Sequence, residues 1–219
     1  EIFIGAIDTS STTILWVPTP PPPHIVEALK AEIDSLNRLV EEGDVPKLPY
    51  LNAIIKETLR LHPLGPLLPR EVQQQCEIRG FLIPENTPMF VNVYQIMRDP
   101  DVLEDPLMFV PERLLVFSEP DKVKKYIPFG SGRRACPCAA LGTVVVMTTA
   151  VAVMVYRFDW NIEGGVDMEE HLEGAILTLK IRFYKLIMTY LFKFSHVTQY
   201  FFVPCICDGC VVGNLWKQK

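Results

Sequence analysis

The stretch FGSGRRACPCAALG, residues 129–142, places two glycines, two arginines and two cysteines directly before a long apolar run. Pro137 suits the first position of a helix, where its missing N–H would have no partner in any case. This predicts Cys136 as the N-cap of a helix over residues 137–156, with its sulfur facing free backbone N–H groups and the positive end of the helix dipole. Cys138, one position into that helix, lacks this placement. Cys136 is therefore the better candidate for a stabilised thiolate.

The residues before the cysteines suggest a ligand. Gly130 and Gly132 allow positive φ angles and a close approach of the backbone to a flat group, and Arg133 and Arg134 can make charge-assisted bonds to carboxylates. A metal macrocycle with acidic side arms would suit a thiolate in this setting. A buried free cysteine at the start of a helix fits the same residues, so the loop alone leaves both interpretations open.

The composition is that of a globular chain. It has 219 residues, 49% of them hydrophobic, and can bury a sizeable core. A net charge of -5 argues against a general nucleic-acid binder. No secretory signal is expected from residue 1 onward, and the apolar run over 141–156 is short for a bilayer-crossing helix. Cysteine usage slightly favours a reducing compartment.

Hydrophobic periodicity predicts a mainly helical fold with a minor β component. Helices are expected over residues 25–36 and 49–62, since apolar residues recur there at helical spacing and prolines flank the second. The prolines of 17–24 predict an extended break. Propensity favours strand or turn for residues 1–16 and short strands within 64–90, whereas the segment over 41–50 and most of 95–115 look irregular. A hairpin is expected over 158–170.

Four motifs in order resemble those of the cytochrome P-450 family of haem-thiolate monooxygenases. The cysteine-loop signature F-x-x-G-x-R-x-C-x-G is matched by Phe129, Gly132, Arg134 and Cys136, with Cys138 where the family has its last glycine. KETLR resembles the E-x-x-R motif, PERLL the P-E-R-F motif, and GAIDTS the oxygen-activation motif of the distal helix. The sequence of these segments is similar to that of plant microsomal members. The resemblance implies a partial P-450 fold: the end of the distal helix, the E-x-x-R helix, the cysteine loop and the following helix.

The resemblance assigns haem as the cofactor, with Cys136 as its axial thiolate ligand. Arg134 and Arg70 would hold the haem propionates, and Phe129 would pack beside the thiolate. For Arg70, a solvated surface charge is the alternative interpretation. Gly132 belongs to the same cofactor-binding loop.

Asp8 and Thr9 match the acid and alcohol pair of the family's proton relay. In the family this helix is distorted, and Thr9 could bond the carbonyl of Gly5 four residues back. Taken without the resemblance, the two residues look like an ordinary aspartate cap and a threonine in a turn.

Glu57 and Arg60 lie three residues apart and can meet on one helix face. That face is roughly opposite the apolar stripe, so amphipathicity alone indicates a solvated ion pair of little energetic value. The resemblance implies instead a buried pair tied to Arg113, which would fix the core beneath the cysteine loop.

By resemblance, the full-length protein would insert one oxygen atom from O2 into a small apolar organic substrate. Electrons would come from an NADPH-dependent reductase, at the cytoplasmic face of the endoplasmic reticulum membrane; this chain shows no anchor. A basic patch of Lys122, Lys124, Lys125 and Arg133 could receive an acidic electron donor, although a plain solvated charge run is the alternative.

The expected organisation is a C-terminal part of a haem-thiolate domain over 1–172 and an unassigned divergent tail over 173–219. Two other functions stay open. The tail could bind zinc through Cys205, Cys207 and Cys210, with His196, although this spacing lacks the paired pattern of a regular zinc site. Alternatively, the chain could be a non-catalytic truncated remnant.

Overall fold

The computed structural model describes residues 9–10, 12–14, 16–17, 22–115, 124–157, 170–173 and 176–179. All of them lie in one compact unit, Glu1–Thr189. Within these ranges the main elements are helices, accompanied by antiparallel strand pairs. The predicted mainly helical fold with a minor β component is confirmed.

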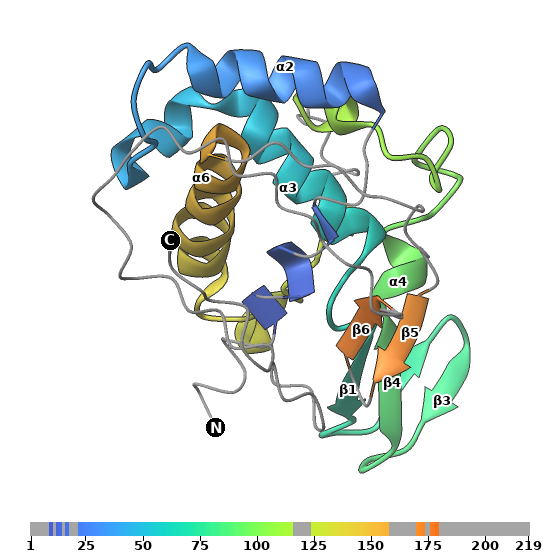
Figure 1. Ribbon diagram of the computed structural model, residues 1–219. Helices are drawn as coiled ribbons and strands as arrows, with labels where there is room; N and C mark the ends of the chain where they lie inside the picture. Colours follow the sequence, from blue (N-terminus) through green and yellow to red (C-terminus); the bar gives the residue numbers. More distant parts are fainter. Residues whose placement is uncertain are drawn as a thin grey trace, which may run out of the picture. The chain divides into compact units, whose positions relative to one another are not determined.

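Three helices build the apolar core: α2 (Pro23–Asp34), α3 (Pro49–Leu61) and α6 (Thr149–Arg157). Figure 1 shows α2 lying across α3, with α6 beside them. Each helix contributes one apolar face, and the buried core residues include Ile25, Leu29, Ile33, Leu51, Ile54, Ile55, Leu59, Val151 and Ala152. The stripe predicted for the helix over 49–62 is therefore the face that joins the other two helices.

Helix α3 begins with a cap supplied by another helix. Pro49 occupies its first turn, and the backbone N–H groups of Tyr50 and Leu51 each donate to the carboxylate of Glu32 on α2 at 2.8 Å. A carboxylate at this end also interacts favourably with the helix dipole. The start of α3 is thus fixed by α2, and its end falls at Leu61, before Pro63.

The N-terminal segment differs from the prediction. Thr9, Ser10, residues 12–14 and Trp16 are helical, so the strand or turn expected from propensity is wrong for them. Thr13 shows why: its hydroxyl donates to the carbonyl of Thr9 four residues back at 3.1 Å, a bond compatible with helix, and the residue is fully buried. The proline break is also shorter than predicted, since α2 already begins at Pro23.

Short elements occupy the segments expected to be irregular. A 3₁₀ helix, η1, spans Glu42–Lys47 where a loop was predicted, α4 spans Val93–Ile96, and η2 spans Pro111–Leu114. Asp44 stabilises η1, since its buried carboxylate accepts from Arg38 and from the backbone N–H of Glu41.

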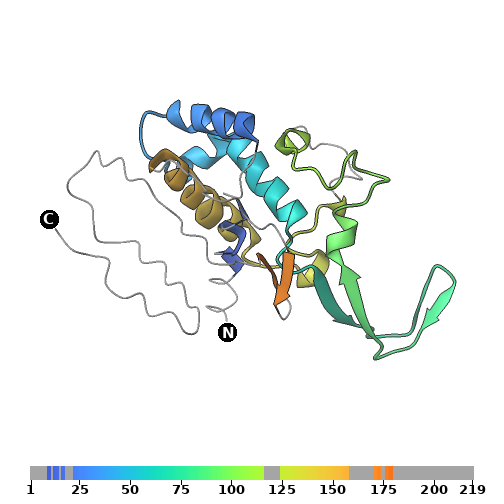
Figure 2. The same cartoon turned by 45° about the vertical axis from the view of Figure 1, so that its right-hand side comes forward.

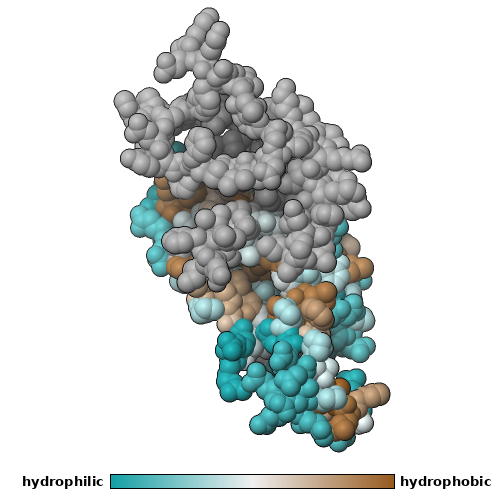
Figure 3. All heavy atoms as spheres, turned by 90° about the horizontal axis from the view of Figure 1, so that it is seen from below, coloured by the Kyte–Doolittle hydropathy of each residue, from teal (hydrophilic) through white to brown (hydrophobic). Residues whose placement is uncertain are grey.

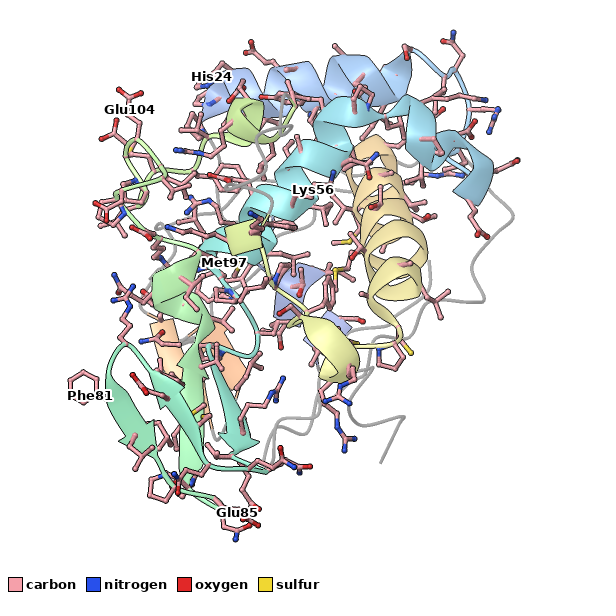
Figure 4. All side chains as sticks on the ribbon, turned by 180° about the vertical axis from the view of Figure 1, so that it is seen from behind. His24, Lys56, Phe81, Glu85, Met97 and Glu104 are labelled. Atoms are coloured by element: carbon pink, nitrogen blue, oxygen red, sulfur yellow. The ribbon has the colours of Figure 1, made fainter. Side chains whose placement is uncertain are left out.

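The β component consists of antiparallel pairs. Strand β1 (Leu67–Glu71) pairs with β4 (Pro88–Asn92), β2 (Cys76–Ile78) with β3 (Phe81–Ile83), and β5 (Glu170–Glu173) with β6 (Ile176–Leu179). In Figure 2 the β2–β3 hairpin extends past β1 and β4. Its Phe81 is 72% exposed and points away from the rest of the chain (Figure 4). Seen from below, the surface of the described residues shows apolar patches among hydrophilic ones (Figure 3).

The helix after the cysteines begins later than predicted and is irregular. Pro137 and Cys138 lie in a turn, helix starts at Ala139, and residues Leu141–Thr148 form the π-helical segment η4, which continues into α6. The Thr148 hydroxyl donates to a carbonyl five residues back at 2.7 Å. No helix in the described ranges has the length and apolarity needed to cross a bilayer. The hairpin predicted over 158–170 lies outside the described residues, except for Glu170.

Candidate functional site

The cysteine loop, residues 129–138, is closed by its own backbone. The N–H of Cys136 donates to the carbonyl of Phe129 at 2.9 Å, and the N–H of Gly130 donates to that of Ile127 at 2.9 Å. Between them the 3₁₀ turn η3 spans Gly132–Arg134. Gly130 and Gly132 have φ angles of 74° and 71°, a conformation that other residues rarely adopt. The positive φ angles predicted for both glycines are confirmed.

Gly130 also permits a close contact with strand β1. A Cβ atom at this position would lie 3.4 Å from Cδ1 of Leu68 and 3.9 Å from Nη2 of Arg70. The loop and the strand therefore pack backbone to side chain, and this contact brings the Arg70 guanidinium beside the cysteine loop.

Cys136 is exposed, as are all of residues 131–138. The prediction that Cys136 caps the helix is wrong. Its carbonyl accepts only a turn-type bond from Ala139 at 3.4 Å, whereas the first four-residue bond runs from Gly142 to the carbonyl of Cys138 at 2.8 Å. Helix starts shift by one or two residues when the first turn is tight. The choice of Cys136 over Cys138 therefore rests on the signature.

The loop carries Phe129 and Arg134, and Arg70 of β1 lies beside it. Arg134 is exposed, and Arg70 is partly buried with Nη1 donating to the carbonyl of Pro69 at 2.8 Å. No carboxylate of the described residues pairs with either guanidinium. Phe129 packs against the helical core and so anchors the start of the loop.

These residues fit a haem group. An exposed cysteine stands on a loop whose Gly130 has a positive φ and packs against Leu68 of β1, and Arg70 from the same strand lies beside it. Cys138 departs from the family signature and is exposed at the end of this loop.

A buried charge cluster lies on α3. The Glu57 side chain is fully buried and that of Arg60 is 2% exposed. Arg60 binds both Glu57 oxygens at 2.8 Å, and Nε of Arg113 lies 3.2 Å from Oε1 of Glu57. The backbone N–H of Val110 donates to the same oxygen at 3.0 Å. The structure thus brings Glu57, Arg60 and Arg113 together in the interior.

Arg60 is satisfied on all sides. Beyond Glu57, its guanidinium donates to the carbonyls of Met97 at 3.2 Å, Pro106 at 2.8 Å and Met108 at 3.2 Å. Met97 follows α4 and lies beside α3 in Figure 4. The solvated ion pair indicated by amphipathicity is absent here because the segment after α4 covers the polar face of α3.

The structure describes some of the remaining predicted residues. Thr9 lies on the N-terminal helical segment, while Asp8, Lys122 and the cysteines of the tail lie outside the described residues. Of the predicted basic patch, Lys125 is engaged by Asp99 at 2.5 Å, and Arg133 is exposed. Within the described ranges no group of three or more metal-binding side chains is present.

Sequence reasoning missed a second cluster. His62, Tyr94 and Arg98 converge on the carboxylate of Glu170, and Trp16 stacks on His62. Because Glu170 is 108 positions from His62 and 72 from Arg98, no local spacing could have marked them as partners.

Comparisons with known proteins agree with this geometry. The cytochrome P450 family model matches residues 1–188. Cytochrome P450 705A22 of Arabidopsis thaliana is 50% identical over 192 residues, covering 82% of this chain and 37% of that protein. Ferruginol synthase of Salvia miltiorrhiza is 43% identical over 190 residues, and the match covers 83% of this chain and 38% of that protein.

A solved structure shows the same arrangement. Zebra fish cytochrome P450, in a structure with progesterone, superposes with a TM-score of 0.72 at 29% identity, covering 81% of this chain and 42% of that one. The partial P-450 fold expected from the motifs is confirmed. The chain spans somewhat over a third of the length of the curated relatives it matches. It belongs to the cytochrome P450 family, of which it represents a C-terminal portion similar to plant members.

Proposed function

We propose that this chain is the haem-binding part of a monooxygenase that inserts one oxygen atom from O2 into a small apolar organic substrate. The observation that carries the proposal is the exposed Cys136 thiol on a loop whose Gly130 packs against β1 beside Arg70. Family membership supports the same reaction class.

Residues of the cysteine loop and Arg70 of β1 would bind the haem together. The sulfur of Cys136 would ligate the haem iron, Arg70 and Arg134 would bond the propionates, and Phe129 would shield the sulfur from water. When bound, the haem supplies the redox chemistry that activates dioxygen. Gly132 keeps the loop in a conformation with positive φ, which presents the backbone without a side chain in the way.

Two further sets of residues support the site. Thr9, with Asp8 before it, would pass protons toward the distal side. The buried Glu57 and Arg60, together with the partly buried Arg113, would hold the frame on which the loop stands. A reductase using NADPH would deliver electrons, with exposed Arg133 as one contact for an acidic partner. The full-length protein would act at the cytoplasmic face of the endoplasmic reticulum membrane.

The decisive experiment is haem reconstitution of this chain, followed by the absorption spectrum of the reduced, carbon-monoxide-bound form. We expect the spectrum typical of thiolate ligation, lost in Cys136→Ser and retained in Cys138→Ser. The second variant is a matched control because both cysteines are exposed on the same loop.

Other outcomes would overturn the proposal. A helical, cooperatively folded chain that takes up no haem would support the non-catalytic remnant. Stoichiometric zinc binding that is lost in Cys205→Ser would favour the metal-binding tail. A thiolate spectrum that survives in Cys136→Ser would place the ligand elsewhere.

A further inference from the structure

Glu170, the first residue of β5, has a carboxylate with three donors from two other segments. The Tyr94 hydroxyl donates to Oε2 at 2.7 Å, Nδ1 of His62 lies 2.9 Å from Oε1, and Nη2 of Arg98 lies 3.2 Å from the same oxygen. The Glu170 side chain is 25% exposed. Bonds to a partly buried carboxylate are stronger than those between neutral groups.

The donors are themselves held in place. The Arg98 guanidinium is 6% exposed, lies 3.4 Å above the Tyr94 ring, and donates to the carbonyl of Leu61 at the end of α3. The His62 ring stacks on Trp16 with centroids 3.8 Å apart and an interplanar angle of 4°. The cluster therefore joins four segments: the N-terminal helical segment, the end of α3, α4 and β5.

The charges of the cluster balance. Burial lowers the pKa of His62 despite its bond to Glu170, so the ring is favoured as a neutral donor. Burial alone would raise the pKa of Glu170, but the bonds from His62 and Tyr94 and the charge of Arg98 outweigh it and lower that pKa. One carboxylate then faces one guanidinium and two neutral donors.

Hairpin β5–β6 needs such an attachment. Among the described residues its two strands pair only with each other, and an isolated two-stranded hairpin is at best marginally stable in water. Figure 1 shows β5 and β6 beside α4, where Tyr94 and Arg98 reach Glu170.

We propose that Glu170 is a positioning residue that fixes hairpin β5–β6 to the place where the end of α3 meets α4, which is marked by His62, Tyr94 and Arg98. Because His62 also stacks on Trp16, the same place holds the helical segment that carries Thr9. A catalytic benefit from positioning Thr9 rests on the proposed function, whereas the attachment of the hairpin requires no haem.

Hydrogen–deuterium exchange of the full chain without haem tests this directly. In Glu170→Gln we expect exchange over residues 170–179 to be about tenfold faster or more, while α2 and α3 keep wild-type protection. Glu77→Gln is the matched control, because Glu77 is exposed on β2, and it should change nothing. Unchanged exchange of the hairpin, or equal acceleration throughout α2 and α3, would overturn the proposal.

His62→Phe separates the two halves of the proposal and serves if Glu170→Gln fails to fold. Phenylalanine keeps a ring for Trp16 but loses the bond to Glu170, so the hairpin should exchange faster while residues 12–17 stay protected. Acceleration confined to residues 12–17 would show that Glu170 does not hold the hairpin. The exchange result is independent of the carbon-monoxide spectrum, so either idea can fail alone.

Discussion

The cysteine loop and the C-terminal half of α3 carry similar polar residues in opposite settings. Residues 131–138 are exposed and closed by backbone bonds within the loop, whereas Glu57 and Arg60 are buried and bonded to backbone groups 37 to 53 positions away. Local sequence determines the first region and tertiary partners determine the second. The difference predicts that the same kind of substitution has unequal costs in the two regions.

The largest expected effect follows from removing Arg60. Arg60→Ala leaves the carboxylate of Glu57 buried without its two-point partner and frees three backbone carbonyls. Breaking a buried pair from one side costs about 3–5 kcal/mol, a large share of the stability of a typical domain. Urea unfolding should show a strongly lowered midpoint or loss of a cooperative transition.

Lys56→Ala is the control for this substitution, because Lys56 is exposed on the same helix (Figure 4). Its free energy of unfolding should stay within about 0.5 kcal/mol of wild type. Similar losses in both variants would contradict the buried role of Arg60.

An intermediate effect is expected in the loop. Gly130→Ala forces a side chain into a left-handed conformation at φ 74°, with Cδ1 of Leu68 at 3.4 Å, and should cost about 1–2 kcal/mol. Gly43→Ala is the comparison, since nothing lies within 4 Å of its added Cβ, and it should change stability by less than about 0.5 kcal/mol. Thermal unfolding of both variants measures the difference. Equal midpoint temperatures would contradict the conformational requirement at position 130.

The smallest expected effect is a loss of stability in acid from the end of α3. The pKa of His62 lies below its usual 6.5 in the folded chain, so below that pH the unfolded chain binds more protons and stability falls. The pKa of Glu170 is also lowered, from 4.5, and adds a second loss at lower pH as its carboxylate becomes protonated.

Urea midpoints measured between about pH 7.5 and pH 5.5 isolate the histidine step. In His62→Gln the slope over this range should be shallower than in wild type, because the titrating ring is gone. A steeper slope in that variant would show that His62 is not the group responsible.

The helices follow from the sequence because their signals are local. In α3, the apolar stripe at Leu51, Ile54, Ile55 and Leu59, together with Pro49 at the first turn, suffices to predict the element and its core face. The glycines of the cysteine loop are likewise predictable from their conformational freedom.

Other features depend on partners that no pattern reveals. Burial of Glu57 and Arg60 requires the irregular segment after α4 to cover them, so amphipathicity points the wrong way and only the motif indicates the result. The helical state of Thr9, Ser10, residues 12–14 and Trp16 overrides polar propensity because Thr13 and Trp16 are buried. Glu170 was missed because its partners meet it only in the fold.

Because Glu32 of α2 caps α3, the spacing between Glu32 and the core residues of α2 has to be kept. Deleting one residue between Leu29 and Glu32 would rotate the preceding part of α2 by about 100° relative to Glu32. If the glutamate stayed in place, Ile25 and Leu29 would leave the core; if they stayed, the carboxylate would leave the N–H groups of Tyr50 and Leu51. Insertions and deletions should therefore accumulate in the connection between the two helices, whereas α2 itself should vary by substitution alone.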